Sequence, residues 1–347
     1  MNALRSVRLR RSLRYAFCLL WISLLLPHGL TIAQEVDFSG FGATGVRIFD
    51  RNPVAEFNQE YYYEGKLQAD IKLSKDIEAQ LDFRGSSDDR EAVLREFSVK
   101  FEYFTYARIK IGNVKKPYSI EGLVDRDEYI PVFDSYIHRR NEELGYAGRN
   151  VGLLVYYNYK DKRPNFPFSY AAGVFRNNSY VTSAYLRGGW HHGGLTTTLG
   201  YATLARSGDD AITTHGFSAD VGYRTGAAET TLEGFYSQDP EEGIRRRLLD
   251  MDESVYTAGL RSLSALRFDI DGDVVEVIEP HMMLTWYAPD AAASSYHTLE
   301  ILVGVNVFLD DDVRLRLSAD GLLTKDRFSD EYSTHGSVFA TEIFVRF

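Results

Sequence analysis

The sequence has almost no cysteine. Its single cysteine, Cys18, lies in an apolar run near the N-terminus, and the chain after Ala33 has none. Disulfides, cysteine-ligated zinc and thiol catalysis are therefore excluded for that part of the chain. Proline is scarce as well, with 9 residues in 347. After the N-terminal run, no stretch approaches the roughly 18 consecutive apolar residues that a membrane-spanning helix requires.

Helical periodicity is also missing, and a two-residue period takes its place. Apolar and polar residues alternate through 67–73, 77–84, 217–224, 299–307 and 313–320. This pattern is typical of strands with one apolar and one polar face. Many of these segments are longer than the five or six residues of an average strand in a soluble protein. Long alternating strands favour a barrel that carries apolar residues outside and polar residues inside.

We expect about 16 strands, an even number that suits a single-chain bacterial barrel. The predicted strands are 36–48, 60–73, 76–86, 92–103, 106–113, 149–158, 168–176, 181–191, 195–206, 213–224, 228–237, 254–270, 273–288, 297–309, 312–324 and 336–347.

The predicted connections alternate in length. Those after the second, fourth, eighth, tenth, twelfth and fourteenth strands have two or three residues, and Asp271-Gly272 is a typical hairpin turn. The other set, which includes 49–59, 114–148, 238–253 and 325–335, is longer and more polar. Outer-membrane barrels have short periplasmic turns and longer extracellular loops in the same alternation.

The N-terminal region has the features of a secretion signal. A basic stretch without acids precedes the apolar run 15–26, and Thr31-Ile32-Ala33 fits a cleavage site. The run is short for a membrane anchor. Removing residues 1–33 removes five of 39 basic and none of 49 acidic residues, which changes the net charge from −10 to −15. The five basic residues are Arg5, Arg8, Arg10, Arg11 and Arg14.

The C-terminal residues alternate up to a final phenylalanine. One face of 339–347 carries Phe339, Thr341, Ile343, Val345 and Phe347. Such a strand resembles the signal that outer-membrane barrels present to their assembly machinery. We therefore predict a signal peptide over 1–33 and an exported outer-membrane β-barrel over 34–347, in contact with outer-membrane lipid and lipopolysaccharide.

The 114–148 connection is the longest. It combines many charges with apolar residues such as Ile120, Leu123, Ile130, Val132 and Phe133. Its apolar residues predict an ordered loop packed on the barrel wall, and ordered long loops are usually functional. We expect it to fold inward as the third extracellular loop and to form a constriction.

A family resemblance begins in the same region. The stretch 112–121, GNVKKPYSIE, is similar to the G-x-x-K-x-P-[FY]-S/G motif of the phosphate-selective porin O and P family. Residues 94–101 resemble the strand before that motif, and 148–152 resemble the strand after it, so the resemblance covers about 90–175. It implies a porin for ions and small hydrophilic solutes, with anion selectivity that comes from interior Arg and Lys, and without a cofactor. Porins of this size are usually trimers, although the sequence shows no trimer contact.

The candidate channel residues follow from strand parity and from the long connection. The basic candidates are Arg84, Arg108, Lys110, Lys115, Lys116, Arg126, Arg139, Arg140, Arg149, Arg224, Arg314 and Arg316. The acidic candidates Glu78, Asp82 and Asp220 share the same face. This mixture favours a weakly selective pore over a dedicated phosphate channel.

Other functional classes have little support in the sequence. His191-His192 and Asp310-Asp311-Asp312 lack the spacing of metal ligands, and no basic surface indicates nucleic-acid binding. An outer-membrane enzyme requires a nucleophile with a positioned histidine, and no such motif stands out. A structural or adhesive barrel with an occluded interior remains the alternative to a channel.

Overall fold

The computed structural model describes residues 35–50, 57–87, 92–158, 166–178, 180–208, 211–249, 251, 255–270, 272, 274–292, 296–325 and 332–347. The predicted signal peptide lies outside these residues.

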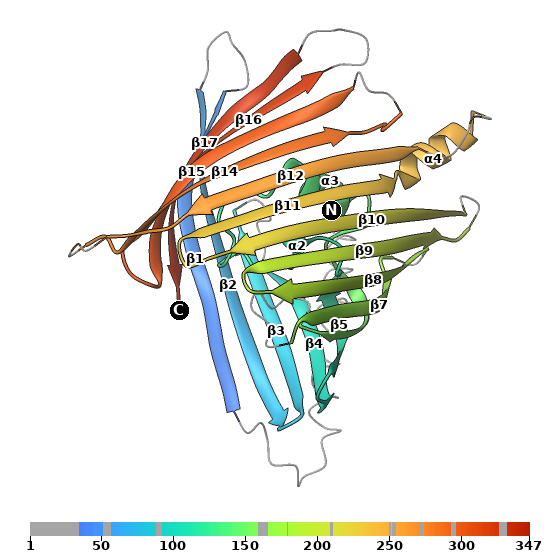
Figure 1. The fold of residues 1–347 in the computed structure, drawn as a ribbon, viewed down its shortest axis with the longest axis horizontal. Helices are drawn as coiled ribbons and strands as arrows, with labels where there is room; N and C mark the ends of the chain where they lie inside the picture. The colour runs from blue at the N-terminus through green and yellow to red at the C-terminus, as the bar shows by residue number, and fades with distance from the viewer. Residues whose placement is uncertain are drawn as a thin grey trace, which may run out of the picture.

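The strands form one closed antiparallel sheet (Figure 1). Strands β12 and β13 both pair with β14 and share one position, so the 17 strands make a barrel of 16. β1 pairs with β17 from Phe41–Arg346 to Asp50–Ser337, which closes the barrel. The predicted all-β barrel is thereby confirmed. The strands are β1 (Glu35–Asp50), β2 (Phe57–Ser74), β3 (Ile77–Ser86), β4 (Val93–Phe104), β5 (Ala107–Lys115), β6 (Arg149–Tyr157), β7 (Phe168–Arg176), β8 (Val181–His192), β9 (Leu195–Arg206), β10 (Ile212–Arg224), β11 (Ala228–Gln238), β12 (Tyr256–Leu266), β13 (Phe268–Asp269), β14 (Val277–Ala288), β15 (His297–Phe308), β16 (Val313–Lys325) and β17 (Tyr332–Arg346).

The period-two pattern sorts side chains between the two faces of the sheet. Large apolar side chains such as Leu67, Leu199 and Ile301 are exposed on the outside. Charged side chains such as Arg261 and Glu342 point inward and are buried. An apolar exterior with a polar interior is the reverse of a soluble protein and is typical of a membrane barrel.

Two connections are longer than predicted. The turn expected at Asp310-Asp311 spans 309–312, because β15 ends at Phe308 and β16 begins at Val313. The hairpin expected at Asp271-Gly272 is wider, because β14 begins at Val277 instead of residue 273. The chain closes this turn through a hydrogen bond from the Ile270 amide to the Glu276 carbonyl, at 2.7 Å. Two-residue connections at Lys75-Asp76 and Gly193-Gly194 agree with the predicted short rim.

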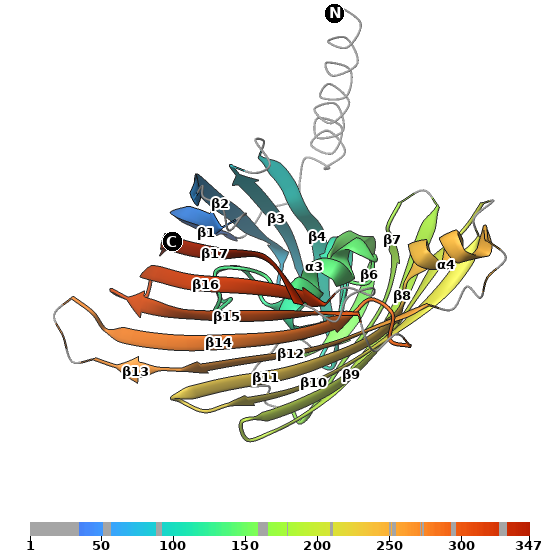
Figure 2. The ribbon, with the colours of Figure 1, turned by 90° about the horizontal axis from the view of Figure 1, so that it is seen from above.

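Three short helices lie among the described residues. α2 (Ile120–Leu123) and α3 (Tyr136–Glu143) belong to the connection between β5 and β6, and α4 (Pro240–Arg247) follows β11. Figure 2 shows α4 near the ends of the strands. α3 instead contacts the inner side of β12 and β14. None of these helices is long and apolar enough to cross a membrane.

Candidate functional site

The 116–148 segment, which joins β5 to β6, is hydrogen-bonded to the inner wall of the barrel. Arg187 on β8 and Ser218 on β10 both donate to the Tyr118 carbonyl, at 3.0 and 2.7 Å. The Ile120 amide donates to Glu233 on β11 at 2.7 Å. These buried polar groups therefore fix the start of the segment on the β8–β11 wall.

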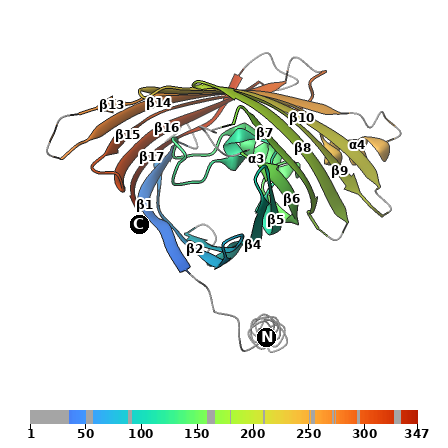
Figure 3. The same cartoon turned by 60° about the horizontal axis from the view of Figure 1, so that its bottom comes forward.

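The middle of the segment is fixed on a different wall. Arg316 on β16 donates to the carbonyls of Tyr129 and Ile130, at 2.9 and 3.1 Å. Arg314 on the same strand donates to the Asp127 carbonyl at 2.7 Å. Because the segment is attached to both β8–β11 and β16, it reaches across the interior, and α3 is drawn within the ring of strands in Figure 3.

An apolar cluster supports this arrangement. Tyr118 stacks on Tyr146, with ring centroids 5.3 Å apart. Both residues belong to one apolar cluster together with Tyr185 and Phe235 of the wall. All four side chains are buried. These aromatic residues of the segment thus pack on the barrel wall.

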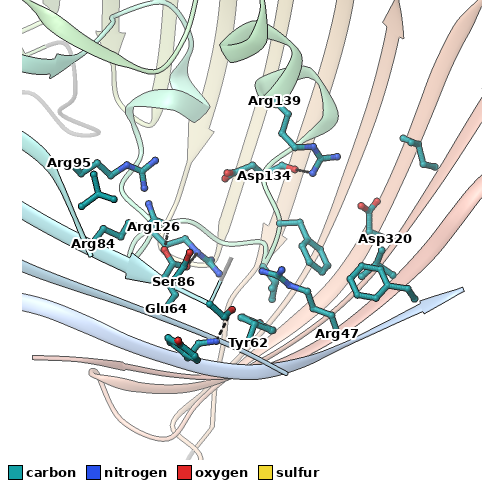
Figure 4. Close-up of a pocket in the computed structure, with 18 residues that line it drawn as sticks. Arg47, Tyr62, Glu64, Arg84, Ser86, Arg95, Arg126, Asp134, Arg139 and Asp320 are labelled. Carbon is teal, nitrogen blue, oxygen red and sulfur yellow. Dashed lines mark hydrogen bonds and ion pairs between the residues drawn. The ribbon is translucent and has the colours of Figure 1, made fainter. Parts of the chain in front are cut away.

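A cavity of about 760 Å³ lies between the segment and the opposite wall (Figure 4). Its lining comes mainly from β1–β4, β16, β17 and residues 126–139. We call it the arginine cavity, because five arginines and only three acids line it. The arginines are Arg47, Arg84, Arg95, Arg126 and Arg139, and the acids are Glu64, Asp134 and Asp320.

Two carboxylates hold the arginines on one side of the cavity. Glu64 forms ion pairs with Arg84 and with Arg126, the second at 3.4 Å. Glu342 is buried and pairs with Arg126 at 2.9 Å. Tyr62 also donates to Glu342 at 3.0 Å. Arg126 is therefore positioned from two strands, β2 and β17.

Arg139 and Arg47 occupy another part of the cavity. Arg139 donates to the Asp134 carbonyl at 2.6 Å and pairs with Glu300 at 3.2 Å. The Arg47 guanidinium lies 4.1 Å from the Tyr62 ring centroid. Stacking on an aromatic ring helps to hold a guanidinium in place.

Arg95 differs from the other arginines of the cavity. It is half-buried, and no acid among the described residues lies within ion-pair distance of its guanidinium. It also lines an adjoining cavity of about 70 Å³, which includes Lys66, Asp82, Lys115 and Arg149. The two cavities share Arg84, Arg95, Arg126 and Asp134 in their linings.

Burial and nearby charges shift the pKa values of two residues of α3, His138 and Glu142. Burial alone lowers the pKa of His138, but the hydrogen bond to Glu142 and the charges of Glu121 and Asp134 outweigh it and raise that pKa to about 9. The same hydrogen bond lowers the pKa of Glu142. His138 is therefore protonated at neutral pH and forms an ion pair with Glu142 at 3.5 Å.

The structure brings six of the sequence-predicted site residues to the two cavities. Arg84, Arg126 and Arg139 line the arginine cavity, and Asp82, Lys115 and Arg149 line the adjoining one. Arg314 and Arg316 instead hold the 116–148 segment.

The remaining candidates lie elsewhere, mostly in ion pairs. Lys116 is buried and donates to the Gly145 carbonyl at 2.7 Å, and burial lowers its pKa to about 7. The other candidates form ion pairs: Arg108 with Glu102, Lys110 with Glu96, Arg140 with Glu143, Arg224 with Glu229, Glu78 with Lys100 and Asp220 with Arg187.

Sequence reasoning missed Arg47, Arg95 and Lys66. Lys66 is the cross-strand partner of Arg84, so its parity marks it as an interior residue. Strand parity does not identify Arg47 or Arg95 as interior residues. The inward positions of β1 include apolar residues, and Arg95 lies at a β-bulge.

A serine–histidine contact lies on the inner wall, apart from these cavities. Ser169 Oγ is 2.8 Å from His191 Nε2, and His191 Nδ1 is 3.0 Å from Thr196 Oγ1. A hydroxyl in place of a carboxylate does not stabilise the imidazolium of a catalytic triad. Within the described ranges, no group of three or more His, Asp or Glu residues is suited to hold a metal ion.

Comparison with known proteins identifies the fold. No protein-family model and no curated protein matches the sequence. Among solved structures, Pseudomonas putida OprB matches with a TM-score of 0.67 at 12% identity, over 90% of this chain and 94% of that one. Salmonella typhi OmpF matches at 0.63 and 13%, over 90% and 97%. The anion-selective porin from Comamonas acidovorans matches at 0.59 and 12%, over 90% and 99%. The chain therefore has the 16-stranded barrel fold of these porins.

Proposed function

We propose that the protein is an outer-membrane channel through which ions and small hydrophilic solutes diffuse, with a preference for anions. The arginine cavity carries this proposal: five arginines and three acids line it, so the lining side chains have a formal charge of +2, while Glu342 and Glu300, which lie outside the lining, pair with Arg126 and Arg139. A net positive lining lowers the barrier for anions and raises it for cations. The porin fold supports the channel role.

In this proposal, the 116–148 segment narrows the channel. Its hydrogen bonds to β8–β11 and β16 leave the passage next to β1–β4, so the segment acts as the constriction. The long connections then face the cell exterior, and the arginine cavity is on that side. The signal peptide directs export, and no cofactor is needed.

In this proposal, the apolar outer face of the barrel contacts the outer membrane. Ile343, Val345 and Phe347 are exposed on the outer face of the last strand, where lipid, lipopolysaccharide and the assembly machinery would contact them. One solved neighbour, the outer-membrane protein OmpT of Vibrio cholerae, is described in a trimer form. A homotrimer is therefore part of the proposal.

Phosphate is the more specific candidate for the preferred solute. The sequence resemblance to phosphate-selective porins favours it, and so do guanidinium groups, which bind phosphate through paired hydrogen bonds. The acids that already pair with Arg84, Arg126 and Arg139 oppose a strongly selective phosphate site.

Planar-bilayer recording tests the function. The mature protein, folded in detergent, is inserted into a bilayer with a KCl gradient, and the reversal potential is measured before and after phosphate is added. We expect stepwise conductance with anion preference. Block by phosphate at low concentration would support the phosphate assignment. Folded protein that gives no conductance would refute the channel and support a structural barrel.

A further inference from the structure

One wall of the arginine cavity is apolar. Phe49 on β1 is the register partner of Val338 on β17, and Val338 is the partner of Asp320 on β16. Leu322 and Phe133, which comes from the 116–148 segment, also line this part of the cavity. Apolar side chains from three adjacent strands and the segment thus meet at one place.

These apolar side chains are only partly covered by the protein. Inner-wall residues such as Tyr185 and Phe235 are buried under the 116–148 segment. Leu322, Val338 and Phe133, in contrast, are only half-buried and border the cavity. Apolar surface that stays in contact with water gains free energy when an apolar group covers it.

The basic wall comes from different elements. Arg84 on β3 and Arg95 on β4 lie on the far side of β2 from the apolar wall, and Figure 4 shows both reaching toward the cavity. Arg84 already shares Glu64 with Arg126. Arg95 has no acid within ion-pair distance among the described residues, so its guanidinium is available for one carboxylate.

We propose that the arginine cavity binds monoanions that combine one carboxylate with an apolar body, such as aromatic or branched-chain carboxylates. The proposal rests on the channel function above and specifies its preferred solute. The carboxylate pairs with Arg95, and the apolar body covers Val338, Leu322 and Phe133. The volume of about 760 Å³ accommodates such a molecule with water around it.

A compact anion with two charges suits this cavity less well. It would require a second unneutralised guanidinium, whereas Arg84, Arg126 and Arg139 already pair with acids. It would also lie near Glu64, Asp134 and Asp320, and like charges repel. It would leave the apolar wall exposed to water.

Benzoate, acetate and inorganic phosphate are suitable probes. Each is added to single channels of the mature protein in KCl, and the concentration that halves the chloride current is measured. We expect benzoate to block at about tenfold lower concentration than acetate or phosphate, since burying a small apolar group is worth roughly tenfold or more in binding.

Two variants test the contributions of the basic wall and the apolar wall separately. Arg95→Gln should weaken benzoate block about tenfold, because it removes the charged partner of the carboxylate. Val338→Ser should weaken benzoate block and leave acetate block unchanged, because acetate has almost no apolar body. Arg108→Gln is the matched control, since Arg108 pairs with Glu102 and does not line the cavity. Resistance of the folded barrel to SDS before heating checks that each variant has folded.

The outcomes are distinguishable. Equal block by the three anions, strongest block by phosphate, or no effect of Val338→Ser would overturn the proposal and leave the channel function intact. Folded protein without conductance would refute the channel function. Equilibrium dialysis of benzoate against the folded protein and the Arg95→Gln variant then decides whether the cavity binds it.

Discussion

At the scale of single residues, buried charge determines how the interior is organised. Glu342 has no solvent-exposed side-chain surface and accepts hydrogen bonds from Arg126, Arg316 and Tyr62. Arg316 also donates to carbonyls of the 116–148 segment. One carboxylate therefore compensates two arginines, one of which fixes the segment while the other lines the arginine cavity.

The Glu342→Ala variant should lose stability. Removing one partner of a buried ion pair leaves an uncompensated charge and costs about 3–5 kcal/mol. We expect the midpoint of urea unfolding in detergent, followed by circular dichroism, to decrease strongly. Asp312→Asn is the control: Asp312 pairs with Arg346 on the exposed rim, where an ion pair contributes at most about 1 kcal/mol. Equal effects of the two variants would contradict this account.

Residue positions also show the limits of sequence reasoning. In β1 the inward residues Phe41 and Ala43 are apolar, so alternation does not mark Arg47 as an interior residue. In β4 the register passes from Glu96 to Leu94 and skips Arg95. Such a β-bulge shifts the direction of neighbouring side chains, and the sequence gives no sign of its position.

At the scale of elements, most strands were predictable because period-two alternation and connection length are local properties of the chain. The path of the 116–148 segment was not. Its partners Arg187, Ser218 and Arg316 are distant in sequence, and nothing local specifies which wall groups accept or donate. The sequence predicted that the segment is ordered, whereas the choice of walls depends on tertiary contacts.

The stability supplied by α3 should depend on pH. The pKa of His138 is raised from 6.5 to about 9 in the folded protein. Its stabilising effect is therefore complete below about pH 6.5 and is lost as the pH rises through about 9. We expect His138→Gln to lower the urea midpoint at pH 6 and to match the unmutated protein at pH 10.

Lys116 provides the internal comparison for this test. Burial lowers its pKa to about 7, so its effect has the opposite sign: folding gains stability as the pH rises from about 7 to 10.5. The difference between the unmutated protein and His138→Gln cancels this contribution, because both carry Lys116. A difference that stays constant from pH 6 to pH 10 would show that His138 acts through packing and not through its charge.

At the scale of the whole molecule, net charge and local charge point in opposite directions. The chain has a net charge of −10, yet the side chains that line the arginine cavity have a formal charge of +2. Exposed charges act over about 10 Å at 0.1 M salt and about 3 Å at 1 M. Acids at the rims therefore have little effect on an ion inside the cavity, where the surrounding protein screens charge less than water does.

This contrast gives a test with matched charge changes. Glu241→Gln with Asp311→Asn raises the net charge by two at exposed positions outside the cavity and should leave the reversal potential unchanged. Arg84→Gln with Arg95→Gln lowers it by two inside the cavity and should shift the reversal potential toward that of a cation-selective channel. Shifts of equal size and opposite sign would instead show that overall charge sets selectivity. Because screening is weakest inside the barrel, we also expect the proposed anion preference of the unmutated protein to decrease only partly between 0.1 and 1 M KCl, whereas selectivity set by rim charges would disappear.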